Sequence, residues 1–252
     1  MLELFHGEPN AISLKPLIAL EEKGSTYRSR LISSQPLERS LPGFPPSPDQ
    51  AINLENDGPV LVDGDETITS SFFMLEYIAE TVAGPALLPR DANGRYQARS
   101  WGQYVALVLS PFVTALGLSR YPIAAAKGDD FSDIERLERR RSWLAAGTSL
   151  PDETKAEHTE KLRIAIARLE QGLASGSGYF AGDGFSIADI DIFAMVRNLE
   201  DLVPGVLGNA PNLKAFIERV AARPSVARAL AKGTGANPNE CFLPGPEPAR
   251  WG

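Results

Sequence analysis

The sequence is poor in the residues from which disulfides and many metal sites are built. Among 252 residues it has one cysteine, Cys241, and two histidines. A single cysteine excludes an intrachain disulfide framework and a zinc site made of cysteines. One thiol without a disulfide is typical of a reducing compartment. We therefore expect a cytoplasmic protein and predict no metal site.

Basic residues and long apolar runs are also scarce. The 25 lysines and arginines are outnumbered by 32 acidic residues, so the formal net charge is −7 and a general nucleic-acid binder is not expected. The opening residues, MLELFHGE, contain no long apolar run, and we expect neither a signal peptide nor a membrane span. The loop and helix motifs of nucleotide-binding proteins, serine hydrolases and zinc proteases are absent.

The first eighty residues alternate strand-like and helix-like stretches. Apolar alternation predicts strands near both ends of this part, and Asp63-Gly64 between two short apolar runs predicts a hairpin. The expected order is strand, helix, strand, loop, two strands and a helix, which indicates a small mixed sheet covered by helices. The ranges are 2–5, 27–32 and 59–68 for strands, and 14–23 and 70–83 for helices, the last ended by Gly84.

From about Arg95 onward the pattern is helical throughout. We predict an α/β domain over 1–85, a linker over 86–94, an all-helical domain over 95–235 and an irregular tail over 236–252, which is rich in proline and glycine. The helices are expected at 95–120, 130–145, 154–174, 186–200, 211–222 and 224–232.

The run NAISLKPLIALEEKG, residues 10–24, is a helix that ends at Gly24. If Ser13 caps this helix, Pro16 is its third residue and has no N–H to be capped, which leaves the hydroxyl freer for a ligand. An ordinary cap bonded to the Lys15 N–H is the alternative, and the sequence alone favours it. Asn10 is a second candidate for the cap, and would place Ser13 inside the first turn.

Two other features are given structural roles. In SIAD, Ser186 caps a helix and Asp189 bonds back to it, much like a capping box. The histidines, His6 and His158, form no constellation. His6 follows the first strand near the predicted site and has the reach to contact a substrate, although a lone histidine is more often simply accommodated.

Five segments, in order along nearly the whole chain, resemble the glutathione S-transferase superfamily. That resemblance implies a thioredoxin-like amino-terminal domain followed by an all-α domain, usually in a dimer. The segments are NAISLKPLIALEEKG, GPVLVDG, ITSSFFMLEYIAE, AGDGFSIADIDIFA and AARPSVARAL.

Within the superfamily the chain is most similar to the bacterial glutathione-dependent β-aryl etherases of lignin breakdown. The likeness rests on the NAISLKPLIALEEKG run, the Ile52-Asn53 stretch before Pro59, GLSRYP and the long stretch from RRRSWLAAG to RLEQGL. It implies that a glutathione thiolate displaces a phenol from an ether-linked aromatic substrate. The helical domain would wall the substrate pocket with aromatic residues, although core packing is their more frequent use: Trp101, Tyr104, Tyr121 and Trp143.

The resemblance also assigns the glutathione site. The hydroxyl of Ser13 would donate a hydrogen bond to the sulfur, which favours the thiolate together with the helix amino end. Pro59 stands where the family has a cis-proline, and the backbone of Gly58 would pair with the cysteinyl unit. Ser70 and Ser71 fall at the family's acidic-residue–serine pair, where Ser71 would bind the γ-glutamyl carboxylate.

The predicted site departs from the subfamily at several positions. Ser70 replaces an acidic residue that pairs with the glutathione ammonium, and Ile12 replaces a polar residue. Glu55 and Asp57 add negative charge where a basic or neutral surface is usual. These changes motivate a second hypothesis: a non-catalytic structural subunit with a degenerate site, paired with a catalytic relative in a heterodimer.

Overall fold

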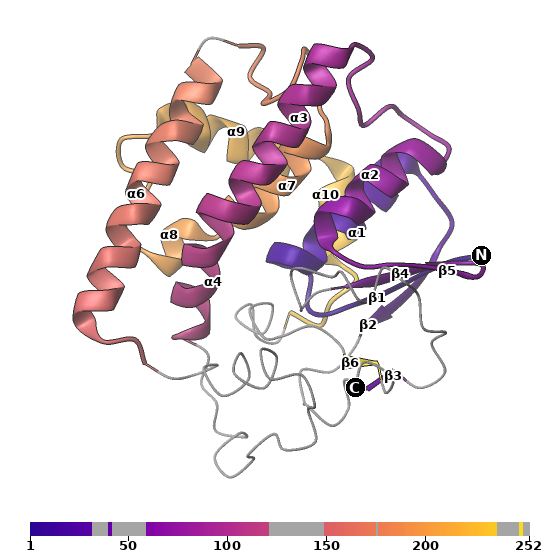
Figure 1. The fold of residues 1–252 in the computed structure, drawn as a ribbon, viewed down its shortest axis with the longest axis horizontal. Helices are drawn as coiled ribbons and strands as arrows, with labels where there is room; N and C mark the ends of the chain where they lie inside the picture. The colour runs from indigo at the N-terminus through magenta and orange to yellow at the C-terminus, as the bar shows by residue number, and fades with distance from the viewer. Residues whose placement is uncertain (32–39, 42–58, 121–148, 175, 236–246, 249–252) are drawn as a thin grey trace.

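The computed structural model describes residues 1–31, 40–41, 59–120, 149–174, 176–235 and 247–248 (Figure 1). Four strands form one mixed sheet in the order β2-β1-β4-β5. Parallel pairing joins β1 to β2, and antiparallel pairing joins β1 to β4 and β4 to β5. The bounds are Leu2–His6 for β1, Arg28–Leu31 for β2, Val60–Asp63 for β4 and Glu66–Ile68 for β5. The hairpin expected around Asp63-Gly64 is present between β4 and β5.

A second, two-residue pairing involves the carboxyl-terminal tail. Strand β3 (Ser40–Leu41) runs parallel to β6 (Glu247–Pro248). This short strand lies within the tail predicted to be irregular, and residues 236–246 and 249–252 lie outside the described part of the chain.

Helix α1 (Ala11–Lys23) is buried on nearly all sides. It packs against α2 (Ser71–Thr81), α7 (Ile187–Val196) and α10 (Pro224–Leu230). It stops where predicted, at Gly24, which adopts the left-handed conformation with φ 64° and donates its N–H to the Glu21 carbonyl. A helix with this much packing is held mainly by tertiary contacts rather than by helix propensity.

Helix α2 ends three residues before the predicted stop at Gly84. The backbone of Val82 is already extended, with φ −86° and ψ 127°. The hydroxyl of Thr81 donates to the Tyr77 carbonyl at 2.6 Å, and the β-branched pair Thr81-Val82 disfavours another helical turn.

The predicted helix over 95–120 contains a π-helical turn. It consists of α3 (Ala92–Tyr104), the π-helix η3 (Val105–Leu109) and α4 (Ser110–Leu118). The Ser110 N–H donates to the Val105 carbonyl, five residues back. Pro111 follows and has no N–H of its own, so the ladder is interrupted at this point. By length and composition alone, a stretch of Ala92–Leu118 is long and apolar enough to cross a membrane, and 33% of it is buried within the fold.

The remaining described helices complete the second half of the fold. Figure 1 shows α3, α4 and α6 on the side of the molecule away from the sheet, with α7 behind them. All ten residues of α7 are buried, which makes it the central helix. The predicted helix at 130–145 lies outside the described residues. The bounds are Asp152–Ala174 for α6, Leu199–Leu202 for α8 and Pro211–Ala221 for α9.

The capping box at the start of α7 is present as predicted. The Asp189 carboxylate accepts from the Ser186 N–H at 2.8 Å and from the Ser186 hydroxyl at 2.9 Å. Its other oxygen accepts from the Phe180 N–H at 2.9 Å. Burial raises the pKa of the Asp189 carboxyl to about 6, against the opposing effect of these hydrogen bonds. The carboxylate therefore fixes both the helix start and the loop before it.

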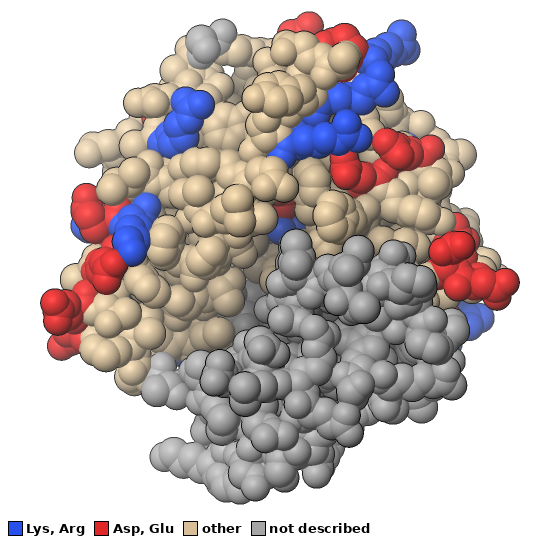
Figure 2. Space-filling model, viewed as in Figure 1, with Lys and Arg blue, Asp and Glu red and all other residues tan. Residues whose placement is uncertain are grey.

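Uncharged side chains cover most of the viewed face over η3 and α4, and charged side chains lie mainly at its margins (Figure 2). Leu107 in η3 is among the most exposed apolar residues described, at 71%.

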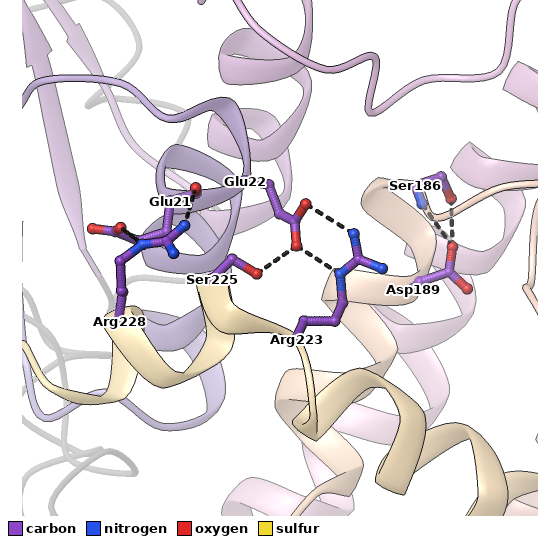
Figure 3. Close-up of polar contacts among 7 residues, drawn as sticks. All are labelled: Glu21, Glu22, Ser186, Asp189, Arg223, Ser225 and Arg228. Carbon is purple, nitrogen blue, oxygen red and sulfur yellow. Dashed lines mark hydrogen bonds and ion pairs between the residues drawn. The ribbon is translucent and has the colours of Figure 1, made fainter.

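A polar cluster joins the end of α1 to α10 (Figure 3). Arg223 binds Glu22 through two hydrogen bonds, of 2.6 and 2.9 Å, and the Ser225 hydroxyl also donates to Glu22. Nearby, Arg228 binds the side chain and the carbonyl of Glu21. Burial raises the pKa of the Glu22 carboxyl, but the hydrogen bonds from Arg223 and Ser225 outweigh it and leave that pKa lowered. The two halves of the fold are thus tied by ionised groups.

Replacing Glu22 by glutamine is expected to lower the free energy of unfolding at neutral pH by about 1–2 kcal/mol, because charge-assisted bonds to Arg223 are lost. A carboxyl with a lowered pKa in the folded state stabilises the fold above its ordinary titration range and loses this effect as the pH falls. The difference between the two proteins in urea unfolding should therefore begin to shrink as the pH falls below about 4.3 and should vanish below the lowered folded-state pKa. Glu160→Gln, in an exposed pair with Arg163, is the control and should change little. A constant difference across pH would contradict the assignment.

Candidate functional site

The amino end of α1 is capped by Asn10 rather than by Ser13. Asn10 has an extended backbone, and its Oδ1 accepts from the Ala11 N–H at 3.0 Å. Ser13 therefore lies inside the first turn, as in the alternative that the sequence left open. The interpretation in which Ser13 caps the helix through the Lys15 N–H is wrong, because the asparagine side chain already closes the helix end.

The hydroxyl of Ser13 is turned toward the loop that follows β1. The Gly7 N–H donates to Ser13 Oγ at 3.0 Å, and Ser13 is 6% exposed. A serine hydroxyl has two lone pairs and one hydrogen, and this bond uses one lone pair. Within the described part of the chain, no residue accepts a hydrogen bond from that hydroxyl. The hydroxyl therefore keeps its donor capacity at the amino end of α1.

Pro59 is brought to the same end of the sheet. It is buried and directly precedes β4, whose first residue, Val60, pairs with Phe5 of β1. The antiparallel register therefore places Pro59 beside His6, one residue before Gly7. Gly58 and the peptide bond that joins it to Pro59 lie outside the described residues, so the backbone contact predicted for Gly58 stays a prediction.

Ser70 and Ser71 form the start of α2. Ser70 has φ 66° and ψ 118°, in a region that residues other than glycine rarely adopt, and strain of about 1–3 kcal/mol at such positions is common at ligand sites. Ser71 is fully buried, and its Oγ accepts from Lys15 Nζ at 3.2 Å. The predicted role of the Ser71 hydroxyl must therefore be shared with Lys15. The first N–H groups of the helix are a second means of binding an anion.

The contact between Lys15 and Ser71 shows that the amino ends of α1 and α2 lie close together. Each helix end carries a partial positive charge. Together with Pro59 at the adjoining end of β4, they bring three of the predicted segments to one place. This arrangement suits an extended ligand with anionic groups.

Lys15 also forms a buried ion pair that the sequence did not reveal. Its Nζ lies 2.7 Å from Asp191 Oδ1 of α7, and the two side chains are 3% and 1% exposed. The helical pattern sets Lys15 apart from the apolar stripe of α1 and does not predict that it is buried. A charged residue inside an apolar stretch of each helix is a sign of burial, but it does not identify the partner. The ion pair couples the predicted site to the central helix of the second half.

The departures from the subfamily have different outcomes. Ile12 is 8% exposed and belongs to the hydrophobic core, so it is a packing residue. Ser70 has no carboxylate, so it cannot neutralise an ammonium. Glu55 and Asp57 lie outside the described residues.

The end of the helical part is anchored to the loop before α1. The Glu8 carboxylate accepts from the N–H of Thr234 at 3.1 Å and from its hydroxyl at 2.5 Å. Only glycine fits at 233, because a Cβ there would lie 2.2 Å from Pro9 Cδ. Glu8 was not identified from the sequence, since its partner lies at the other end of the chain. This anchor restrains the loop that contains Gly7.

The two histidines are separate in the fold. His6 is fully buried, so its side chain is not exposed to a substrate. His158 lies edge-on to Phe112 in the helical part, with ring centroids 5.5 Å apart. Among the described residues, no group of three His, Cys, Asp or Glu side chains is placed to hold a metal ion.

Trp101 and Tyr104 line a cavity of about 700 Å³ formed by α3, α6 and the loop before α7. They pack edge-on with centroids 5.5 Å apart, and Trp101 packs similarly on Phe180 at 5.0 Å. The cavity lining contains none of the predicted glutathione-binding residues. Trp101 and Tyr104 therefore contribute to core packing and line a cavity that is separate from the predicted glutathione site. Tyr121 and Trp143 lie outside the described residues.

Comparison with known proteins supports the family resemblance. Residues 140–233 match the family model "Glutathione S-transferase, C-terminal domain". The chain is 28% identical to Protein LigF of Sphingobium sp. strain SYK-6 over 92% of this chain and 93% of that protein. It is 26% identical to a probable maleylacetoacetate isomerase of Vibrio cholerae over 89% and 91% of the two chains.

Solved structures with the same fold also support the resemblance. The crystal structure of the β-etherase LigF superposes with a TM-score of 0.77 at 27% identity, covering 92% of this chain and 99% of that one. A glutathione transferase from Burkholderia graminis, with two glutathione molecules bound per subunit, superposes with a TM-score of 0.67 at 24% identity over 93% and 89%. The predicted fold class, a thioredoxin-like domain plus an all-α domain, is confirmed, as is the resemblance to the superfamily.

Proposed function

We propose that this chain, which has the glutathione S-transferase fold, is a glutathione-dependent transferase of the β-etherase type. The observation that carries the proposal is the Ser13 hydroxyl. Its oxygen accepts from the Gly7 N–H, which leaves the hydroxyl hydrogen available to a ligand, and the amino end of α2 lies nearby. The similarity to LigF over nearly the whole chain favours an aryl ether as the second substrate.

The described residues fit glutathione as a substrate. The two helix amino ends favour its carboxylates and its thiolate. Ser13 donates to the sulfur and so favours the ionised form. Pro59 stands beside the loop that would lie along the cysteinyl unit. Because Ser70 cannot pair with the ammonium group, we expect binding to be weak.

Glutathione supplies the nucleophile: a bond forms between its sulfur and the ether carbon, and the bond from that carbon to the phenol oxygen breaks. The phenolate leaves with the electron pair and takes up a proton from solvent, replacing the proton that the thiol released. The protein holds the thiolate and brings the two substrates together. We expect the helical part to hold the aromatic rings, and we propose a dimer, without assigning whether the second chain is identical.

Binding is tested by calorimetry and thermal unfolding with millimolar glutathione. We expect saturable heat, a raised unfolding temperature and a weaker response to S-methylglutathione, which lacks an ionisable thiol. Turnover is tested with an aryl ether whose phenol becomes fluorescent on release. The absence of any heat or thermal shift would overturn the glutathione site. Binding without phenol release, but with conversion of another aromatic electrophile, would retain the transferase and reject the etherase reaction.

A further inference from the structure

A chain of hydrogen bonds leads from the sheet to the Ser13 hydroxyl. Ser29 Oγ lies 2.7 Å from His6 Nε2, and His6 Nδ1 lies 2.7 Å from the Gly7 carbonyl oxygen. The Gly7 N–H then donates to Ser13 Oγ at 3.0 Å. Four residues from β2, the end of β1, the following loop and α1 are thus connected.

The register of the sheet explains why Ser29 meets His6. The two strands are parallel, and His6 pairs with Leu31. Ser29 lies two residues before Leu31, so its side chain is on the same face of the sheet as that of His6. Burial of His6 excludes water as a competing partner for its ring.

The hydrogen bonds fix the tautomer of His6. A carbonyl oxygen accepts only, so the bond to Gly7 requires hydrogen on Nδ1. In the neutral ring Nε2 then has a lone pair and accepts from the Ser29 hydroxyl. Burial lowers the pKa of the His6 imidazole and outweighs the hydrogen bond to the Gly7 carbonyl and the Glu8 carboxylate, which both raise it, while the Lys232 ammonium lowers it to a smaller extent. The ring is therefore neutral at physiological pH.

Gly7 is held on both sides by this network. Its carbonyl is bound by His6, and its N–H is bound to Ser13 Oγ. The oxygen of Ser13 is an acceptor toward Gly7, so the hydroxyl hydrogen points in another direction. If Gly7 turned, its N–H would leave Ser13 and the hydroxyl would lose this fixed orientation.

We propose that His6 is a positioning residue for Ser13: the neutral Nδ1–H ring, fixed by Ser29, holds Gly7 so that the Ser13 hydroxyl donates toward the ligand sulfur. The proposal rests on the proposed function, in which Ser13 donates to the thiolate of glutathione. His6 itself touches neither substrate, so its effect is on the ionisation of the bound thiol and on kcat.

The test compares substitutions that keep or remove the Nδ1–H donor. In His6→Asn the amide N–H replaces that donor, whereas His6→Gln places its amide toward Ser29 and His6→Leu has none. The ultraviolet absorbance of bound glutathione thiolate is followed against pH, together with kcat and KM. We expect the Gln and Leu variants to lower the thiolate fraction at neutral pH and kcat by about two- to tenfold with little change in KM for glutathione. The Asn variant should remain close to wild type.

Two further variants keep the test decisive. Ser29→Ala removes the hydroxyl that holds the His6 ring through Nε2, and should act in the same direction by about twofold even if substitutions of buried His6 prevent folding. His158→Asn, in the helical part, should leave thiolate fraction and kcat unchanged. If Ser29→Ala and the folded His6 variants all match wild type, the proposal is overturned.

A measurement without glutathione separates this proposal from the proposed function. Nitrogen-15 chemical shifts of the histidine rings report which nitrogen carries the hydrogen. We expect the Nδ1–H form for His6 in wild type, and the Nε2–H form would overturn the positioning role. If the Nδ1–H form is found but wild type binds no glutathione, the network stands and the proposed function fails.

Discussion

Replacing Ser13 by alanine is expected to lower kcat by about ten- to hundredfold near neutral pH, because the thiolate loses a charge-assisted hydrogen bond of about 1.5–3 kcal/mol. KM for glutathione should change much less, since the contacts proposed for the rest of the tripeptide do not involve Ser13. Raising the pH should restore part of the rate, because the thiol then ionises without help from the hydroxyl. Steady-state kinetics across a pH series measure all three effects.

Ser25→Ala is the matched control for this experiment, because Ser25 follows Gly24 at the opposite end of the same helix. It should leave both kinetic constants near those of wild type. If alanine at position 13 kept kcat within twofold at neutral pH, the hydroxyl would only support the loop at Gly7. The role assigned to Ser13 would then be withdrawn.

Breaking the buried pair between Lys15 and Asp191 is expected to have the largest effect on stability. Lys15→Met leaves the Asp191 carboxylate without its cation in a site that is 1% exposed. Removing one partner of such a pair typically costs about 3–5 kcal/mol. For a chain of this size, the unfolding temperature should fall on the order of 10 °C, as measured by calorimetry.

The partner substitution and the double variant complete a thermodynamic cycle. Asp191→Leu alone should also be strongly destabilising, whereas Lys15→Met with Asp191→Leu should recover much of the loss because no buried charge is left unpaired. Lys161→Met is the control, since Lys161 and Glu157 are about half exposed and such pairs contribute little. Additive losses in the double variant would contradict a direct coupling.

Features encoded by neighbouring residues could be predicted from the sequence. The stop of α1 at Gly24, the hairpin at Asp63-Gly64 and the capping box of Ser186 and Asp189 each depend on a few adjacent positions. Turns and helix caps are determined by residues close together in the sequence, so the local sequence pattern is sufficient to predict them. The end of α2 was misjudged because the pattern favoured Gly84, while the β-branched pair at 81–82 ended the helix earlier.

Features that join distant positions could not be predicted. Lys15 is buried because Asp191 approaches it from another helix, and nothing around Lys15 in the sequence shows this. His6 gains its role only when the sheet places Ser29 beside it. Asn10 and Ser13 are both good capping residues within one turn of each other, so the sequence does not decide between them. The structure shows that the Asn10 side chain caps the helix. Motifs therefore indicated which segments meet near the amino end of α1, but not the side-chain contacts that join them.

The buried ion pair between Lys15 of α1 and Asp191 of α7 also limits which chimaeras of this fold can be stable. A chimaera that joins the first half of this chain to the helical half of a relative would bury Lys15 against whatever residue occupies the place of Asp191. An apolar residue there would strand a cation in the interior. A stable chimaera would therefore have to carry both charged residues or neither, so the two halves of this fold cannot be exchanged independently at this contact.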